Sequence, residues 1–355
     1  MRTLELSRAD SPALWGEGHG ESFRHEIAAL AAIRLHLAVT WGQVSGPDEV
    51  LALAAAHVPV LERFDRDLFD ELSGIARGAN ISPALAVVLN AYTDLRDIAP
   101  ARGLRPDGGC SVVYARTPEG PALAQTWDMH ATAIPFVMML RVPDTAAGPG
   151  AWLFSLTGCL GMAGLSSAGV GLTINNLPST DAKVGAVWPA IVRRALREPS
   201  AAFAKDAILS APIGSGHCYL VADNRDAFAI ETSGTKREVV FSGDADSYIH
   251  TNHCASEVVA AHTSKERESP TSRARQAGLE ASFSARPAAS VADLWTRLGA
   301  FDGTGNTPCQ LRCTPEHPHG AATCGAIAMD LSRPTALAAP GLIHRVLPER
   351  FDFEP

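Results

Sequence analysis

The stretch Pro106-Asp107-Gly108-Gly109-Cys110-Ser111-Val112-Val113-Tyr114 marks the point where the character of this chain changes. Before it, apolar residues recur at helical spacing; after it, they follow the two-residue period of strands, broken by Gly and Pro turns. The two glycines give the backbone unusual freedom just where the first strand begins. A cysteine after Gly-Gly is usually a buried structural residue, so this stretch alone does not establish a chemistry.

The segment before residue 105 is predicted to be helical. Ile27, Leu30, Ile33 and Leu37 are spaced by three and four residues, which places them on one face of a helix. A second helix is expected to open at Pro47, because proline and the acidic residues after it suit a first helical turn. Two more helices are predicted, over residues 61–76 and 83–95.

The remainder of the chain is predicted to be rich in strands. Turn residues separate short runs with a period of two, and Asn224-Arg225-Asp226 suggests an antiparallel hairpin. The polar run from Ser264 to Arg275 is compatible with a loop or with the start of a helix. Sheets with helices before and between them favour a layered sandwich. The strands expected are 111–115, 123–126, 136–142, 152–156, 169–174, 217–221, 228–232, 238–241, 248–251 and 325–329, with helices over 188–197, 201–209, 271–282 and 291–298.

Composition limits the classes of function. The chain has 355 residues, 46% of them hydrophobic and 19% charged, which is typical of a globular protein. A net charge of −8 offers no basic surface for nucleic acid. We expect a cytoplasmic protein that does not bind a membrane, because we find no apolar run of membrane-spanning length and no secretory signal. The chain has seven cysteines, and this odd number favours reduced thiols over a set of disulfide pairs. Neither a dinucleotide fingerprint nor a phosphate loop occurs, so no cofactor is expected.

Five segments in the same order resemble the acyl-coenzyme A:isopenicillin N acyltransferase family, the peptidase C45 type of N-terminal-nucleophile (Ntn) hydrolases. The choloylglycine hydrolases are more distant relatives of this family. The resemblance spans nearly the whole chain, and five weak motifs in register make a strong signal. The segments are Gly16-Glu17-Gly18-His19-Gly20-Glu21, residues 71–79, Gly109-Cys110-Ser111 with Gln125-Thr126-Trp127-Asp128, His250-Thr251-Asn252-His253, and residues 324–330.

This resemblance implies an α+β fold, a four-layer αββα Ntn-hydrolase sandwich with two antiparallel sheets. It also implies that the chain cuts itself between Gly109 and Cys110. Residues 1–109 would form a helical α subunit and residues 110–355 the β subunit. The two would remain associated as one structural domain.

Self-cleavage would turn Cys110 into the catalytic nucleophile. A free thiol has a pKa near about 8.5 and needs a base, and a new α-amine with a pKa of about 7.7–8.0 would provide one within the same residue. Attack of the Cys110 thiol on the carbonyl of Gly109, followed by hydrolysis, would generate that amine. The expected chemistry is cleavage or transfer of an acyl group on a linear amide through a Cys110 thioester.

The resemblance assigns roles to further residues. Asp128 would orient the α-ammonium of Cys110, and Asn252 would donate to the oxyanion of the tetrahedral intermediate. Arg312 is our candidate for the family's active-site arginine, although an arginine on a loop is equally often a surface charge. Thr126 is expected to contact substrate. Asn175 and Asn176 are candidates for the same role, but consecutive asparagines suit a plain turn equally well.

Several alternatives remain open at this level. His250, His253 and Cys254, and separately Cys309, Cys313, His317, His319 and Cys324, are dense enough to suggest zinc, but their spacing does not match a standard site, so no metal is expected. A transferase dependent on CoA or an amine would share the acyl-Cys110 intermediate with an amidase. A non-catalytic binding protein with the same fold is the other alternative. The expected partners are a small-molecule amide or acyl donor and an amine acceptor if transfer occurs; the sequence leaves a homo-oligomer open.

Overall fold

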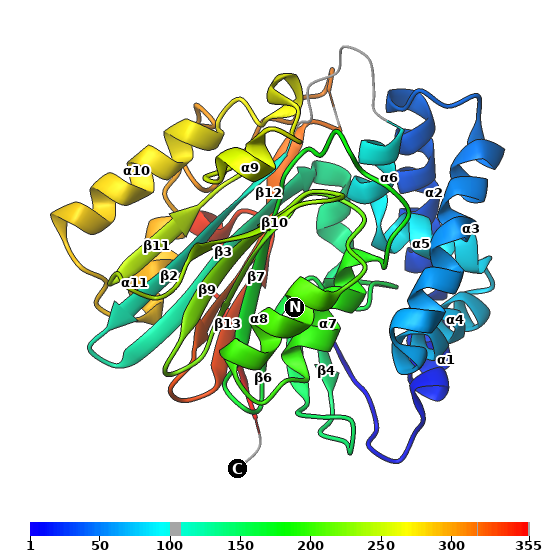
Figure 1. Cartoon of the computed structure of the whole chain (residues 1–355), viewed down its shortest axis with the longest axis horizontal. Coiled ribbons are helices and arrows are strands. Elements are labelled where there is room, and N and C mark those ends of the chain that lie inside the picture. The colour runs from blue at the N-terminus through cyan, green and yellow to red at the C-terminus, as the bar shows by residue number, and fades with distance from the viewer. Residues whose placement is uncertain (100–107, 318, 354–355) are drawn as a thin grey trace.

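The computed structural model describes residues 1–99, 108–317 and 319–353, and these residues form two stacked β-sheets flanked by helices (Figure 1). The larger sheet has the order β1-β4-β5-β6-β7-β8-β9-β10 and the smaller one β11-β2-β3-β12-β13-β14. Within the described ranges every neighbouring pair is antiparallel except β1 and β4, which run parallel. The strands are β1 (Arg2–Glu5), β2 (Gly109–Thr117), β3 (Gly120–His130), β4 (Val137–Val142), β5 (Ala151–Leu156), β6 (Ala163–Ser166), β7 (Gly171–Asn176), β8 (His217–Ala222), β9 (Ala227–Thr232), β10 (Arg237–Phe241), β11 (Ser247–His250), β12 (Ala321–Asp330), β13 (Thr335–Pro340) and β14 (Glu349–Asp352).

Helices cover both sheets and give the four layers expected of the αββα sandwich. The strands β2 and β3 of the smaller sheet pack against β7 of the larger one. The outer face of the smaller sheet is covered by α10 (Ser272–Ala285) and α11 (Val291–Leu298), and α7 (Trp188–Leu196) and α8 (Ala201–Ser210) cover the larger sheet. A short helix, α9 (Glu257–Ala260), and three 3₁₀ turns at 131–136, 265–267 and 343–345 complete the elements of the described ranges.

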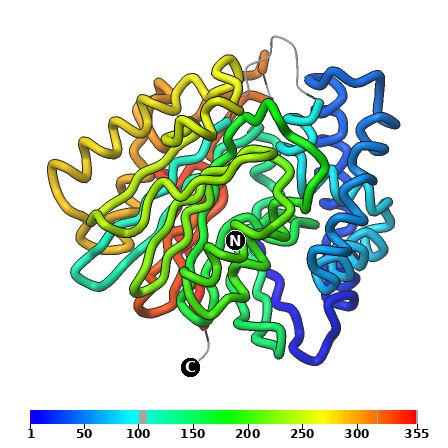
Figure 2. The backbone as a smooth tube through the Cα atoms, viewed as in Figure 1, coloured from blue at the N-terminus to red at the C-terminus, as the bar shows by residue number. Residues whose placement is uncertain are grey.

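The helices that precede β2 gather beside the two sheets, as the tube in Figure 2 shows. The helices before β2 are α1 (Pro12–Ser22), α2 (Arg24–Trp41), α3 (Pro47–Phe64), α4 (Arg66–Ala79), α5 (Pro83–Asn90) and α6 (Tyr92–Ile98). None of the single helices in the described part of the chain is long and apolar enough to cross a membrane. Only the bent pair α4–α5, taken together, meets those criteria of length and composition.

The first two family-like motifs are the two halves of one helix contact. Gly16 and Gly20 of α1 lie against Gly74 and Gly78 of α4 so closely that a Cβ added at any of them would lie within 2.5 Å of backbone of the facing helix. Glu71, on the same face of α4, forms a buried ion pair with Arg193 of α7, with both oxygens accepting at 2.9 Å. The glycine spacing therefore encodes the close packing of these two helices.

Several predicted boundaries are wrong. The predicted helix 61–76 is divided at Asp65, whose side chain accepts from the backbone N–H of Leu68 and so begins α4. The predicted helix 83–95 is likewise divided, at Ala91. The strand expected from residue 136 begins at Val137, after a 3₁₀ turn. Helix α1 and strands β1, β6, β13 and β14 were not predicted; the three strands β1, β6 and β14 have only four residues each, too few to show a period.

Candidate active site

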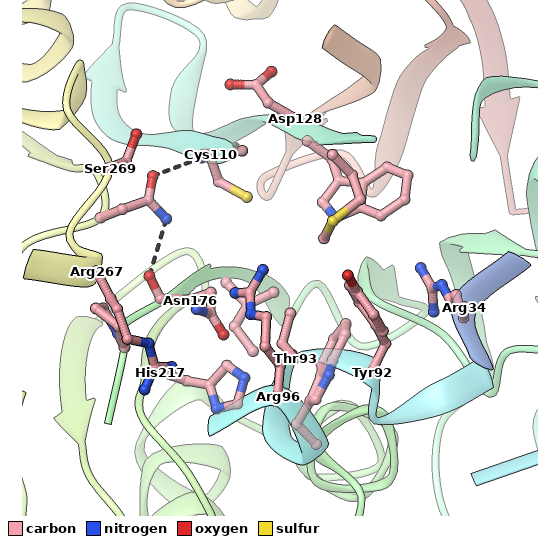
Figure 3. Close-up of a pocket in the computed structure, with 18 of the residues that line it drawn as sticks. Arg34, Tyr92, Thr93, Arg96, Cys110, Asp128, Asn176, His217, Arg267 and Ser269 are labelled. Carbon is pink, nitrogen blue, oxygen red and sulfur yellow. Dashed lines mark hydrogen bonds between the residues drawn. The ribbon is translucent and has the colours of Figure 1, made fainter. Parts of the chain in front are cut away.

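A cavity lies where the start of β2 meets the N-terminal helices and the larger sheet (Figure 3). Its wall combines residues from before and after Gly109, so both sides of the expected cleavage point build it. The lining residues are Arg34, Asn90, Tyr92, Thr93, Arg96, Gly108, Gly109, Cys110, Trp127, Asp128, Met129, Ile174, Asn176, Pro178, Trp188, His217, Asn252, Arg267 and Ser269.

The alternation of β2 and β3 places the thiol and the carboxylate on opposite faces of the sheet. Cys110 pairs with Trp127 in the strand register, and Gly109 pairs with Asp128. Side chains of successive residues point to opposite faces, so Cys110 faces the cavity while Asp128 faces the layer of α10 and α11. Figure 3 shows the Cys110 sulfur directed into the cavity and the Asp128 carboxylate directed away from it. The Gly109–Cys110 peptide therefore lies between the two groups.

A set of hydrogen bonds holds the backbone of Cys110 from three elements. Its N–H donates to Asn252 Oδ1 at 2.7 Å. Its carbonyl accepts from Asn175 Nδ2 of β7 at 3.0 Å and from Arg275 Nη1 of α10 at 2.7 Å. Arg275 also donates to the Ser111 hydroxyl and to Asn252 Oδ1, both at 2.9 Å. This side chain is fully buried and is the central donor around the nucleophile.

Gly109 lies in close contact with the Arg275 guanidinium. A Cβ at this position would lie 2.5 Å from Arg275 Nη2 and 3.0 Å from Asn252 Oδ1. Real Cβ atoms do not come as close as the first of these distances, so any side chain would displace the guanidinium. A glycine before Cys110 therefore lets the Arg275 guanidinium keep its position.

The carboxylate of Asp128 is fully enclosed on the outer face. It accepts from the Thr323 hydroxyl at 2.6 Å and from Gln310 Nε2 at 3.0 Å. Burial raises the pKa of Asp128 to about 7, with Arg275, Thr323 and Arg312 acting in the opposite direction. An acid with a pKa near neutrality can both hold and release a proton.

The thiol of Cys110 is protonated in this uncut chain. Burial, and then the charge of Asp128, raise its pKa to about 12, against the opposing effects of Arg275 and Gln125. A nucleophile in this state needs a base. His217, the only histidine among the described residues that line the cavity, is a poor candidate because burial lowers its pKa to about 3.

Other predicted site residues lie in the same neighbourhood. Thr126 accepts from the N–H of Ser111 on the outer face, so it supports β2 and its hydroxyl is directed away from the cavity. Asn176 lines the cavity, and its carbonyl accepts from Asn252 Nδ2 at 3.0 Å. The amide of Asn252 is therefore already engaged on both sides in the uncut chain.

Arg275, the arginine that contacts the backbone of Cys110, was not among the predicted site residues. Arg312, selected instead, lies near enough for its charge to lower the pKa of Asp128. Arg275 ends the polar run for which both a loop and the start of a helix were compatible with the sequence. The spacing of buried residues along this segment nevertheless indicates a helix with Arg275 on its buried face. Arg275, Leu279 and Phe283 are spaced by four, and all three are buried on one face of α10.

A chain of buried hydrogen bonds holds Asn175, whose amide donates to the carbonyl of Cys110. Asn175 Oδ1 lies 2.8 Å from His250 Nδ1, and His250 Nε2 lies 2.9 Å from Glu231 Oε1. Glu231 also accepts from the N–H groups of Ala255 and Ser256. His250, earlier weighed as a zinc ligand, thus links a buried carboxylate to the Asn175 amide that holds Cys110.

The histidines and cysteines in the described part of the chain do not form a group that could hold a metal ion. Among residues 1–99, 108–317 and 319–353, no three His, Cys, Asp or Glu side chains are arranged to hold a metal ion. Cys309 Sγ lies 3.2 Å from His344 Nδ1, whereas Cys324 contacts backbone carbonyls of β3. All seven cysteines are free thiols.

Two stacked sheets covered by helices, with a cysteine near the start of strand β2 at a cavity, form a site that suits acyl transfer or amide hydrolysis. Residues 115–296, slightly more than half of the chain, match the family described as acyl-coenzyme A:6-aminopenicillanic acid acyl-transferase. The chain belongs to this family. The match begins just after Cys110, so it does not include the residues of the expected cleavage point.

Individual proteins are similar to this chain in sequence or in structure. The acyl-coenzyme A:6-aminopenicillanic-acid-acyltransferase 40 kDa form of Emericella nidulans is 26% identical over 256 residues, covering 71% of this chain and 69% of the relative. Penicillin V acylase from Agrobacterium tumefaciens has a TM-score of 0.44 and 12% identity, over 68% of this chain and 84% of that one. A mutant of conjugated bile acid hydrolase from Clostridium perfringens has a TM-score of 0.43 and 13% identity, over 68% and 92%.

Proposed function

We propose that this chain cuts itself between Gly109 and Cys110 and then uses Cys110 as an N-terminal nucleophile to cleave or transfer an acyl group of an amide. The observation that carries the proposal is the position of this peptide bond. It opens strand β2 with the thiol in the cavity, a titratable carboxylate on the opposite face, and Asn252 and Arg275 bonded around it.

The cleavage step conserves atoms and protons. The Cys110 sulfur bonds to the carbonyl carbon of Gly109 while the C–N bond breaks, and the thiol proton passes to the departing nitrogen. Water then hydrolyses the thioester, which leaves a carboxylate on Gly109 and a free thiol and α-amine on Cys110. The raised pKa of Asp128 supports a role as the group that relays this proton.

Cleavage gives the thiol a base within its own residue. An α-amine with a pKa of about 7.7–8.0 can take the thiol proton as sulfur attacks the substrate carbonyl and then pass it to the leaving amine. The α-amine would remain close to Asn252 Oδ1, which accepts from the Cys110 N–H in the uncut chain. The acyl-Cys110 thioester is then resolved by water or by an amine.

The proposed α and β subunits, residues 1–109 and 110–355, stay together in this scheme. Arg34, Asn90, Tyr92, Thr93 and Arg96 line the cavity from the α side, so the β side alone would leave it open. We favour amide hydrolysis because water needs no acceptor site. Transfer from a CoA thioester is the second candidate, supported by the name of the Emericella relative.

The decisive experiment is intact mass spectrometry on the wild type, on Cys110→Ala and on Cys254→Ala, a matched loss of another thiol with a raised pKa. We expect two polypeptides, ending at Gly109 and beginning at Cys110, from the wild type and from Cys254→Ala. Cys110→Ala should remain whole and inactive. An uncut wild type, or amidase activity that survives in Cys110→Ala, would contradict the mechanism. Turnover of acyl amides and CoA thioesters, with and without amines, then separates hydrolysis from transfer.

A further inference from the structure

We propose that the cavity binds the carboxylate of its amide substrate through Arg34 and Arg96, on the wall across from Cys110. This inference rests on the proposed function only for the identity of the attacking group. Both arginines come from helices that precede the cleavage point, α2 and α6, and Figure 3 shows them facing the strand that carries Cys110.

Arg34 is a buried cation without a carboxylate partner among the described residues. Its side chain is only 3% exposed, one nitrogen donates to the carbonyl of Leu89, and Nε has no hydrogen-bond partner in the described part of the chain. The groups whose charge affects Arg34 are Cys159, Tyr92 and Cys324, none of them a carboxylate. Buried charges in proteins are normally paired, because desolvating an unpaired ion is costly. An unpaired guanidinium on a cavity wall therefore points to an anionic ligand.

Arg96 approaches the same place from α6. Its guanidinium carbon lies 5.7 Å from the centre of the Tyr92 ring, and that of Arg34 lies 5.6 Å from the same ring, so both cations lie close to Tyr92. The Nε atom of Arg96 also has no partner among residues 1–99, 108–317 and 319–353.

Burial raises the pKa of two nearby carboxyl groups, Asp94 and Asp97, and the charge of Arg96 acts to lower it. Other groups already engage Asp97, however, and burial disfavours the charged form of Asp94. Asp97 is already bonded to Arg267 and to the Ser179 and Ser215 groups. Burial, and then the charge of Asp97, hold the pKa of Asp94 well above its usual range, which favours the neutral acid. The cavity thus carries an excess of positive charge in a chain whose net charge is −8. Such a local field attracts an anion into the cavity.

A carboxylate fits this site better than a phosphate of a CoA donor. Planar guanidinium groups pair with carboxylates through two parallel hydrogen bonds. The phosphates of CoA are separated from the thioester by the long pantetheine arm, whereas the two arginines line the same cavity as Cys110. Trp127, Ile174 and Trp188 offer apolar surface for the remaining groups. The substrate class is therefore an N-acyl amino acid or a similar amide with a carboxylate.

Binding to the uncut Cys110→Ala chain tests this site without turnover. Calorimetry would compare hexanoylglycine with hexanoylglycinamide, which differ only in the charge of the carboxyl end. We expect the carboxylate to bind ~10-fold more tightly or better, because hydrogen bonds to charged groups exceed neutral ones by such amounts. Arg96→Gln should remove most of this preference. Arg63→Gln, the same charge change on an exposed residue of α3, should preserve it.

Equal affinity for the two ligands, or a preference that survives in Arg96→Gln, would overturn the carboxylate site. Tighter binding of CoA or inorganic phosphate than of hexanoylglycine would overturn the choice of ligand. If Arg96→Gln fails to fold by near-ultraviolet circular dichroism, Arg96→Lys replaces it, with partial loss of the preference expected. Self-cleavage of the wild type is scored separately by mass. An uncut wild type whose Cys110→Ala form still prefers the carboxylate would refute the proposed function and leave this site standing.

Discussion

The two faces of the smaller sheet around Cys110 differ in how completely their polar groups are bonded. On the outer face, Arg275 and Asp128 are buried and each is bonded to two or more partners. On the cavity side, Arg34 and Arg96 have nitrogen atoms without partners in the described ranges. On the outer face only Gln310 Oε1 lacks a partner among the described residues of the Asp128 and Arg275 network, whereas on the cavity side both arginines keep unpaired donors.

This difference suggests that the outer face positions the Gly109–Cys110 peptide and that the cavity side binds substrate. A bonded network that includes buried charges fixes geometry, because moving any member leaves another unpaired. Such rigidity suits the positioning of the Gly109–Cys110 peptide and the thiol. Unpaired donors on the cavity side cost stability until a substrate supplies an acceptor, which suits selective binding. Substitutions on the outer face should therefore affect folding and self-cleavage together, and substitutions on the cavity side should affect substrate binding.

The largest effect is expected from Arg275→Met. This change removes the donor shared by Cys110, Ser111 and Asn252 and leaves Asp128 without the cation that most lowers its pKa. In the Cys110→Ala background, chemical denaturation should show a loss of about 3–5 kcal/mol in unfolding free energy. With Cys110 present, intact mass should show an uncut chain.

Arg273 provides the matched control for Arg275. It lies on the same helix but is exposed, and its ion pair with Glu268 is at the surface. Arg273→Met should change the unfolding free energy by no more than about 0.5 kcal/mol and should leave cleavage intact. Equal effects of the two substitutions would refute the importance of the outer-face network.

A smaller effect is expected from Gly109→Ala. The added methyl would meet Arg275 Nη2 at 2.5 Å, so the guanidinium must shift, at a cost of about 1–3 kcal/mol. Cleavage, followed by mass over time, should slow. Gly278→Ala on α10 is the control, since its Cβ would meet nothing within 4 Å and alanine favours a helix by up to about 1 kcal/mol. Cleavage of Gly109→Ala at the wild-type rate would argue against the close contact.

The smallest effect concerns the pH dependence of stability. Asp128 has a pKa of about 7 in the folded chain against the ordinary value of 3.8, so the folded state holds its proton more tightly and its contribution weakens as pH rises from about 4 through 7. Relative to the same chain with Asp128→Asn, the Cys110→Ala chain should lose roughly 2 kcal/mol of unfolding free energy between pH 5 and pH 8. Arg312→Gln should move this loss to higher pH, because the Arg312 charge lowers the pKa of Asp128. Parallel pH curves with and without the Asp128→Asn substitution would contradict the raised pKa.

Much of the fold could be predicted from the sequence because its signals are local. Helix α11 and the strands of the β8–β9 hairpin were predicted nearly to the residue, since apolar periodicity and turn residues act over a few positions. The predicted helix 61–76 failed because its apolar spacing continues across Asp65, while a single capping side chain ends one helix and begins the next. The strand β13 was missed because its run of small residues, Thr335–Pro340, carries little pattern.

The sequence by itself determined the family and the bond for which we propose cleavage, because Gly109-Cys110, Asp128 and Asn252 follow one another in a recognisable order. The tertiary structure decided which arginine contacts Cys110, because Arg275 and Arg312 are equally charged and only folding buries the first against the nucleophile strand. Folding likewise brings Arg34 and Arg96, which lie on different helices, close to the same Tyr92 ring at the cavity. The sequence gives the charge of each side chain. The burial and the bonding partners of that charge, which determine its pKa and its role, arise only when distant segments pack together.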